Sequence, residues 1–307
     1  MNARLSALGL GTLARRLLGV RLGRLRQYPP QALPLAQADI ARTDRQHLPR
    51  ISLVTPSLNQ ARYVGRTLHS VLSQDYPDLD YIVQDGGSRD GSADVIAAFA
   101  GAQLTIRSEP DSGQADALNK GFARSTGTVM GYLNSDDLLL PGTLLRVGRH
   151  FRDHPEVDVI YGNRLIVDED DREIGTWVLP GHDAELIRHI DYVPQETLFW
   201  RRRIWERTGA AFDPDLHFAL DWDLILRFVE AGAVIHHLPD LFGVFRVHGS
   251  QKTQADFLSR GAAEMSALRS RHRAAGGRLE GMIRHGRFLC RHRTADALYR
   301  RARAGTA

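Results

Sequence analysis

Four short apolar runs between residues 51 and 133 alternate with segments of helical periodicity, and each run stops at a polar or acidic cluster. The runs are ISLV from Ile51, YIV from Tyr81, LTI from Leu104 and VMGYL from Val129. Apolar residues at helical spacing predict a helix over 64–72, and residues 92–100 and 113–125 also read as helices. Strands that alternate with helices predict an α/β fold in which helices flank a mostly parallel sheet.

The polar clusters stand at equivalent places, immediately after each predicted strand. They cover residues 55–59, 85–90, 109–113 and 134–137. The carboxyl ends of parallel strands meet at one edge of a sheet, and ligands of open α/β sheets bind beyond that edge. The sequence therefore predicts one ligand site that is built from these four loops.

The second half of the chain has a less regular pattern. Strands are expected at 157–161, 175–179, 197–200, 234–235 and 242–247, a helix at 220–231, and Arg-rich helices from about 254. We therefore expect three parts. Residues 1–49 would form a basic amphipathic helix and a linker, residues 50–250 the α/β domain, and residues 251–307 an Arg-rich helical extension.

The charge of the chain divides along these boundaries. The formal net charge is +4, but residues 1–50 carry +7, residues 51–249 carry −12 and residues 250–307 carry +9. Leucines and arginines at helical spacing near the N-terminus are typical of a helix that lies on an anionic membrane surface. The alternative is that both basic ends pack on the core. Aromatic residues do not interleave with the arginines, so nucleic acid is not an expected partner.

Composition and missing motifs exclude several classes of protein. The single cysteine, Cys290, excludes a disulfide framework and a cysteine-based zinc site. No run of 18 apolar residues predicts a transmembrane helix. The sequence has no G-x-G-x-x-G turn that opens a helix after a strand, no P-loop and no G-x-S-x-G elbow, so dinucleotide, P-loop and serine-hydrolase chemistry are unsupported.

Four aspartates stand where ligand chemistry and local structure are both reasonable explanations. Asp85 could accept hydrogen bonds from a base or ribose, or it could organise a Gly-rich turn. Asp136 and Asp137 are adjacent carboxylates that need compensation, either from a divalent cation with phosphate oxygens or from donors of a capped turn. Asp221, at the start of an apolar helix, could be a helix cap or a general base.

Three further residues have narrower alternatives. Asp223 follows Asp221 by two positions, so the two side chains point to different faces of the helix and cannot serve one site. His248 ends a predicted strand and could bind metal or phosphate, or it could be structural. Arg246, two residues earlier, could pair with a phosphate or with a carboxylate.

Taken together, these segments resemble the family 2 inverting glycosyltransferases, which have the GT-A fold. Five segments in the same order carry the resemblance: ISLVTPSLNQARYVGRTLHSVLSQDYPDLDYIVQDGGSRDGS, SEPDSGQADALNKGFARSTGTVMGYLNSDD, PQETLFWRR, LDWDLILR and FRVHGSQKT. They cover about residues 51–250, and the look-alikes build O-antigen, capsule or exopolysaccharide repeat units in bacteria. The resemblance implies a GT-A fold with a Rossmann-like sheet between two basic helical extensions.

The resemblance also implies roles for individual residues. The residues implied to bind the nucleotide-sugar are Thr55, Pro56, Asn59, Asp85, Asp111, Lys120, Asn134, Ser135 and Asp136. Asp85 would contact the base, which is usually uracil. The implied metal ligands are Asp136 and His248, with Asp137 sharing that role, and the implied catalytic base is Asp221. Gln195 and Glu196 would lie on the acceptor side.

The implied activity is the inverting transfer of a sugar from a nucleotide-diphospho-sugar, usually a UDP-sugar, to a hydroxyl of a glycan or lipid-diphosphate-linked acceptor. Mg²⁺ or Mn²⁺ would be the cofactor, and the enzyme would be cytoplasmic, at the inner face of the cytoplasmic membrane.

Such families usually have Asp where this chain has Asn134. This departure leaves metal dependence open, and it keeps a catalytically inactive sugar-nucleotide-binding or scaffold protein as the alternative. A nucleotidyltransferase is disfavoured because GLGTLARR at 9–16 follows no predicted strand.

Overall fold

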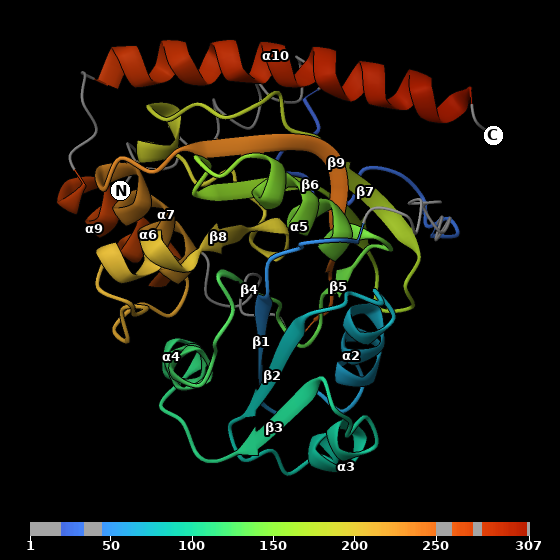
Figure 1. Cartoon of the computed structure of the whole chain (residues 1–307). Helices are drawn as coiled ribbons and strands as arrows, with labels where there is room; N and C mark the ends of the chain where they lie inside the picture. Colours follow the sequence, from blue (N-terminus) through green and yellow to red (C-terminus); the bar gives the residue numbers. More distant parts are fainter. Residues whose placement is uncertain (1–19, 34–44, 250–259, 273–277, 306–307) are drawn as a thin grey trace.

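The computed structural model describes residues 20–33, 45–249, 260–272 and 278–305 (Figure 1). Most of the predicted N-terminal helix and linker therefore lies outside the described residues. The first half of the body alternates strands and helices in the predicted order. Its elements are β1 (Ile51–Ser57), α2 (Val64–Leu72), β2 (Leu79–Asp85), α3 (Ser92–Ala97), β3 (Leu104–Ser108), α4 (Gln114–Ala123) and β4 (Val129–Tyr132).

The strands of this half are parallel, which confirms the predicted α/β arrangement. β1 lies between β2 and β4 and is parallel to both, and β3 is parallel to β2. The register pairs Ser57 with Asp85, and Asp85 with Ser108, so the three strands end at the same edge of the sheet. The loops after these strands therefore gather at that edge, as the sequence predicts.

The second half extends the same sheet with a mixture of parallel and antiparallel pairs. Its elements are β5 (Leu138–Leu139), α5 (Thr143–Asp153), β6 (Val159–Val167), β7 (Glu173–Trp177), η1 (Leu186–Arg188), η2 (Gln195–Thr197), β8 (Phe199–Arg201), α6 (Arg202–Arg207), α7 (Leu220–Glu230) and β9 (Ile235–Arg246). The strand order is β3-β2-β1-β4-β8-β6-β9-β5, and β7 pairs with β6. β8 is antiparallel to β4 and to β6, so it joins the two halves into one sheet.

β9 is one strand of 12 residues, whereas the sequence pattern predicts two short strands. Pro239 lies within it and has no N–H to donate. The structure accommodates the proline because the parallel pairing of β9 with β6 shifts its register on either side of Asn163. Two helices, α5 and α6, were not predicted from the pattern.

Two hydrophobic cores cover the two faces of the sheet. Alternation along β1 divides its side chains, because Leu53 belongs to one core and Val54 to the other. α2, α3 and α5 pack on the Leu53 side, and α4, α6 and α7 pack on the Val54 side. The second core holds a cluster of aromatic rings that fixes α4 and α7 against the sheet; its members include Phe122, Trp200, Trp205, Phe212 and Phe228.

The described parts of the basic ends pack on this body. α10 (Arg278–Ala304) crosses the end of the molecule that holds β6, β7 and β9 (Figure 1). Arg303 donates to both carboxylate oxygens of Glu173 at 2.5 and 2.7 Å, and the ring of Phe288 lies 4.7 Å from that of Tyr192. Val20, upstream, is fully buried in the Val54-side core. Among the described residues, no helix combines the length and apolar character that crossing a membrane requires.

Candidate active site

The loops after β1 and β2 are tied together by side chains of the predicted nucleotide-binding set. Asp85 is buried and accepts hydrogen bonds from the N–H groups of Gly87 and Ser88 at 3.1 Å and from the hydroxyl of Ser108 at 2.7 Å. Asn59, in the left-handed region with φ 53°, donates its N–H to the Ser88 hydroxyl at 2.8 Å. Asp85 therefore shapes this loop. Its contact with a base stays a prediction.

The loops after β2 and β3 meet at Gly86. A Cβ atom at this position would lie 2.5 Å from Oδ2 of Asp111, so only glycine allows this close approach. Asp111 itself accepts the N–H of Gly113 at 3.0 Å, at the start of α4. Lys120 donates from Nζ to the carbonyl of Pro110 at 2.8 Å. Asp111 and Lys120 thus border the same loop, and their contact with the nucleotide-sugar stays a prediction.

Three other predicted residues support the pocket from behind. Thr55 and Pro56 are buried in β1, and the Thr55 hydroxyl lies 2.9 Å from the Tyr81 hydroxyl inside the fold. Ser135 is buried, and its carbonyl accepts the hydroxyl of Thr67 at 2.9 Å. The side chain of Thr55 and the backbone of Ser135 are therefore part of the framework of the strand ends.

Asn134 connects the donor loops to the predicted acceptor side. Its Oδ1 accepts from Nε2 of Gln114, at the start of α4, at 2.7 Å. Its Nδ2 donates to Oε1 of Gln195 at 3.0 Å and to Oδ2 of Asp137 at 3.4 Å. A carboxylate here would have no N–H to donate and would repel Asp137. The local hydrogen bonds therefore explain the asparagine, because only an amide can accept from Gln114 and also donate to Gln195 and Asp137.

Asp136 and His248 face each other across the strand ends. Oδ2 of Asp136 lies 2.9 Å from Nε2 of His248, with side-chain exposures of 16% and 1%. The ring of Tyr63 packs 4.6 Å from the histidine ring, and Nε of Arg246 donates to the Asp136 carbonyl at 2.8 Å. The structure thus brings together the two predicted metal ligands, which are 112 residues apart in sequence.

Asp137 points the other way, into the protein. It is buried, and its Oδ1 accepts the N–H of Arg246 at 3.0 Å. Burial raises the pKa of its carboxyl well above the usual value, and the charges of Asp136 and Glu196 raise it further. Its position makes Asp137 a framework residue beneath Asp136.

The side chains of Asp136 and His248 fit a divalent cation that also binds a diphosphate. In the parts of the chain that the structure describes, no group of three or more His, Cys, Asp or Glu residues forms a metal site. Asp136 and His248 supply one carboxylate and one imidazole side by side. Mg²⁺ sites are commonly completed by substrate phosphates beside one or two protein carboxylates, and Mn²⁺ accepts similar ligands. These two residues would hold such an ion together with the diphosphate of the nucleotide-sugar.

Asp221 lies in the first turn of α7, where its Oδ1 accepts the N–H of Trp222 at 2.9 Å. The residue is half-buried. Burial raises the pKa of its carboxyl from 3.8 to about 6, against the opposing effect of the Trp222 N–H, and the charge of Glu196 adds to the rise. Such a carboxylate is ionised at neutral pH and is a stronger base than an ordinary aspartate.

Asp223 is separated from Asp221 in the way the spacing predicts. Its carboxylate is buried and pairs with Arg227 at 2.8 Å, within α7. Arg271 and His272, each at 3.4 Å, approach its other oxygen. Asp223 therefore stabilises α7 and its packing against Arg271 and His272. Of the two carboxylates, only that of Asp221 is partly exposed, so Asp221 is the one that can face the site.

Glu196 and Arg164 form a buried pair beside Asp221. Nη1 of Arg164 lies 3.5 Å from Oε2 of Glu196, and the guanidinium stacks over the rings of Trp177 and Phe245. Burial raises the pKa of the Glu196 carboxyl, and the Arg164 charge opposes that rise. The predicted acceptor residues Gln195 and Glu196 thus lie between Asn134 and Asp221.

Asp191 is an acidic neighbour of Asp221 that no sequence motif marks. Burial and the charge of Asp221 raise the pKa of its carboxyl well above the usual value. Its Oδ1 is buried and has no hydrogen-bond partner among the described residues. The charges of Asp221, Asp191 and Glu196 also act on the buried phenol of Tyr132, whose pKa burial raises, which places them in one region. The only feature of the sequence that could have indicated Asp191 is its place three residues before the PQET segment.

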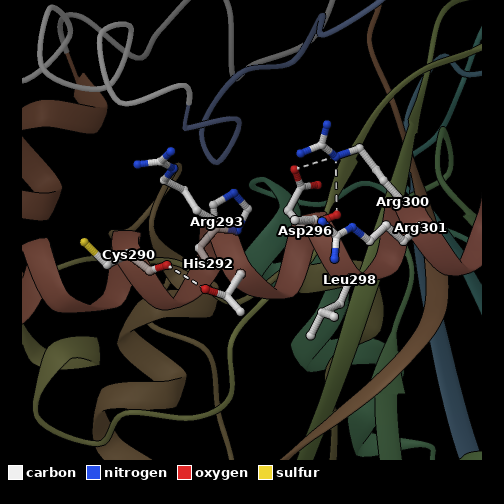
Figure 2. Close-up of a pocket in the computed structure, with 9 residues that line it drawn as sticks. Cys290, His292, Arg293, Asp296, Leu298, Arg300 and Arg301 are labelled. Carbon is white, nitrogen blue, oxygen red and sulfur yellow. Dashed lines mark hydrogen bonds and ion pairs between the residues drawn. The ribbon is translucent and has the colours of Figure 1, made fainter.

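Two cavities bear on where ligands bind. A small one, about 70 Å³, lies between the start of α4 and the loop 214–217, beside the donor loops. A larger one, about 480 Å³, lies along α10 and is lined by Arg293, Thr294, Arg300 and Arg301 among others (Figure 2). Arg300 in this cavity bonds to Asp296 on the same helix (Figure 2). None of the predicted site residues lines the larger cavity, so its chemistry is separate from theirs.

The fold and the site define a glycosyltransferase with a GT-A-type fold. A parallel half-sheet ends in polar loops, and the second half of the chain supplies Glu196 from η2 and Asp221 from the first turn of α7. The chain belongs to glycosyl transferase family 2, whose model matches residues 52–218. This confirms the family resemblance and the enzyme class that were predicted from the motifs.

Curated relatives support the same class. The chain is 28% identical over 191 residues to a PGL/p-HBAD biosynthesis glycosyltransferase of Mycobacterium tuberculosis, covering 61% of this chain and 72% of the relative. It is 30% identical over 253 residues to the O-antigen biosynthesis protein RfbC of Myxococcus xanthus, covering 80% of this chain but 19% of that protein.

Solved structures confirm the fold. TarS 1-349 of S. aureus in complex with UDP-GlcNAc matches with a TM-score of 0.61 and 18% identity, over 79% of this chain and 72% of that one. A mannosyltransferase of Pyrobaculum calidifontis, in complex with GDP-Man and Mn²⁺, matches with a TM-score of 0.59 and 20% identity, over 97% and 85% of the two chains.

Proposed function

We propose that this enzyme transfers a sugar, with inversion, from a nucleotide-diphospho-sugar to a hydroxyl of a glycan or lipid-diphosphate-linked acceptor in bacterial surface polysaccharide synthesis. The observation that carries the proposal is Asp221, a carboxylate with raised basicity at the edge of the donor loops. The relative named for O-antigen biosynthesis supports the pathway class, and the neighbour bound to UDP-GlcNAc supports a UDP-sugar donor.

The reaction would be one displacement. Asp221 accepts the proton of the acceptor hydroxyl while that oxygen attacks the anomeric carbon from the face opposite the diphosphate. The bond between the anomeric carbon and the diphosphate oxygen breaks, and the configuration inverts. Asp136 and His248 would hold a divalent ion, which offsets the charge that develops on the leaving diphosphate. Gln195 and Glu196, between Asn134 and Asp221, would orient the acceptor.

The test is release of nucleoside diphosphate from a panel of UDP-, GDP- and dTDP-sugars, with and without glycan and lipid-diphosphate acceptors. We expect one donor to be consumed in an acceptor-dependent way, and NMR of the product to show an anomeric configuration opposite to that of the donor. Retention would contradict the displacement by Asp221. Donor binding without any transfer would instead favour the inactive sugar-nucleotide-binding protein, for which Asn134 is the one supporting observation.

We also propose that α10 holds the enzyme near anionic lipid at the inner face of the cytoplasmic membrane. Its exposed residues include Arg293 and Arg301, and Leu298 beside them is 59% exposed. Basic side chains near an anionic surface contribute about 1 kcal/mol each. α10 also packs on the body through Arg303 and Glu173, and its exposed arginines support the proposal of a basic surface that faces outward.

Replacing Arg293 and Arg301 together with serine should weaken binding to phosphatidylglycerol vesicles by about tenfold or more, because two such contributions are lost. Sedimentation with vesicles measures this, with phosphatidylcholine vesicles as the uncharged reference. The matched control replaces Arg89 and Arg107, which are exposed on the donor side of the sheet. Equal loss in both variants would show a general charge effect, and no loss would contradict the role of α10. Deletion of residues 1–19, which keeps the buried Val20 in place, tests the N-terminal end in the same way.

A further inference from the structure

α9 (Ala262–Arg271) lies beyond the segments that carry the family resemblance, yet it contacts the start of the helix that holds Asp221. The carboxylate of Glu264, in the first turn of α9, accepts hydrogen bonds from the backbone N–H groups of three consecutive residues. Its Oε2 accepts from Phe218 at 2.8 Å and from Ala219 at 3.0 Å, and the N–H of His217 lies 3.1 Å from Oε1. All three groups precede Asp221 by no more than four residues.

These bonds fix the residues that lead into α7, a helix without a side-chain cap at its N-cap residue. The N-cap residue of α7 is Ala219, which has no side-chain oxygen, and no side-chain cap bond is made from within the helix. The first N–H groups of a helix need partners from elsewhere, and a negative charge at this end is favoured by the helix dipole. From a different helix, Glu264 supplies a negative charge at this end, a partner for the N–H of the N-cap residue Ala219, and partners for the two N–H groups before it. The way the chain enters the first turn of α7 therefore depends on α9.

A second side chain of α9 contacts the backbone close to Asp191. Nε of Arg269 donates to the carbonyl of His189 at 2.8 Å, two residues before Asp191, and its guanidinium lies 5.4 Å from the ring of Trp222. Its charge acts on the carboxyl of Asp191. Leu268, between the two contacts, is fully buried in the core that contains α7. α9 is therefore anchored to both backbone segments that carry acids at the acceptor side.

We propose that α9 is part of the transfer site and that Glu264 is a positioning residue for Asp221. The proposal rests on the proposed function, because it takes Asp221 as the base. It assigns a role in catalysis to α9, which lies C-terminal to the matched family domain. The C-terminal extension would then contribute to the transfer reaction as well as to membrane binding. Glu264 acts through the backbone at 217–219, and Arg269 acts through the backbone at His189.

Glu264→Ala should lower kcat by about tenfold to 100-fold while the KM for the donor changes less than about twofold. In the described parts of the chain, the hydrogen bonds of α9 to other segments go to residues 189, 213, 217–219 and 223 and not to the donor loops. The acidic limb of the pH–rate profile should move below about 6, because a loosened first turn admits water to Asp221. The groups that face Asp221 remain unchanged in this variant: Glu196, Arg164, Asp191 and Tyr132. Glu264→Gln, which keeps one acceptor oxygen, should retain an intermediate kcat.

The matched control is Glu206→Gln, which removes a carboxylate from an exposed position of α6 and should change neither kcat nor the pH profile. If Glu264→Ala fails to fold, Arg269→Gln at an exposed position serves instead, with a raised KM for the acceptor as the expected result. An unchanged kcat and an unchanged acidic limb in Glu264→Ala would overturn the proposal.

A measurement without turnover separates this proposal from the proposed function. Hydrogen exchange of the amides at 217–219 should become at least about tenfold faster in Glu264→Ala, because those N–H groups lose their partner, and this holds whether or not a donor has been found. Unchanged exchange would overturn the role of Glu264 in positioning. Absence of transfer in the wild-type enzyme with every donor would instead contradict the proposed function, and the exchange result would still stand.

Discussion

Replacing Asp221 with asparagine is expected to lower kcat by about 10² to 10⁴-fold, the usual contribution of a general base, and to leave donor binding almost unchanged. The amide is similar in size to the carboxylate and can still accept the N–H of Trp222, so the first turn of α7 should keep its geometry. It cannot accept a proton from the acceptor hydroxyl. Initial rates and isothermal titration of the donor measure the two effects separately.

The same variant should be more stable than the wild-type protein at neutral and alkaline pH. The pKa of Asp221 is about 6 in the folded protein and 3.8 ordinarily, because burial disfavours the charged form. Ionisation of this carboxyl therefore costs folding free energy above pH 6, and this cost disappears below pH 3.8. Asp221→Asn should raise the free energy of unfolding by about 1 to 3 kcal/mol near pH 8, with the gain lost as the pH falls through 6.

Asp223→Asn is the matched control for both effects. Asp223 pairs with Arg227 and is buried, so its loss should lower stability. It has no free side toward the site, so kcat should fall by less than about tenfold in the folded fraction. Full activity of Asp221→Asn would contradict the assignment of the base. Loss of activity together with loss of stability would indicate a structural role for Asp221.

The parallel half of the fold was predictable because each of its signals is local. Ile51 to Val54 and Tyr81 to Val83 are continuous apolar runs with turn residues directly after them, and buried parallel strands have this pattern. The second half resisted prediction for two reasons. Arginines interrupt the apolar positions of α5, and β9 passes through Pro239 with a shifted register that only its pairing with β6 explains.

The candidate site was predictable as a set of positions but not as a set of side-chain directions. The spacing places Asp136 and Asp137 together, but only the packing shows that Asp136 faces His248 while Asp137 bonds to the backbone of Arg246. Asp191 and Glu264 escaped sequence reasoning because their partners lie 30 and about 45 residues away and no local motif marks them. Long-range hydrogen bonds and shared burial produce no periodic signal in a single sequence.

Replacing Asp136 with asparagine is the second large effect that we expect. It removes the carboxylate of the proposed ion site that Asp136 and His248 would form, so donor and metal should bind more weakly and kcat/KM should fall about 10²-fold or more. Thermal unfolding measures binding without turnover. Mn²⁺ together with nucleoside diphosphate should raise the Tm of the wild-type protein. This rise should be lost in Asp136→Asn, and His248→Gln should reduce it.

Two neighbouring variants distinguish loss of a ligand from loss of charge. Asp137→Asn removes a carboxylate at the adjacent position but keeps an oxygen for the N–H of Arg246, so the Mn²⁺-dependent rise in Tm should largely survive. Asn134→Asp adds a carboxylate beside Asp137 and deprives Gln195 of a donor, so it should lower Tm without metal and increase the gain that Mn²⁺ provides. If Asp136→Asn kept the full Mn²⁺ response, the ligand assignment would be wrong. The ion would then be held by other groups. A wild-type protein without any Mn²⁺ response would instead indicate that protein groups alone stabilise the leaving diphosphate.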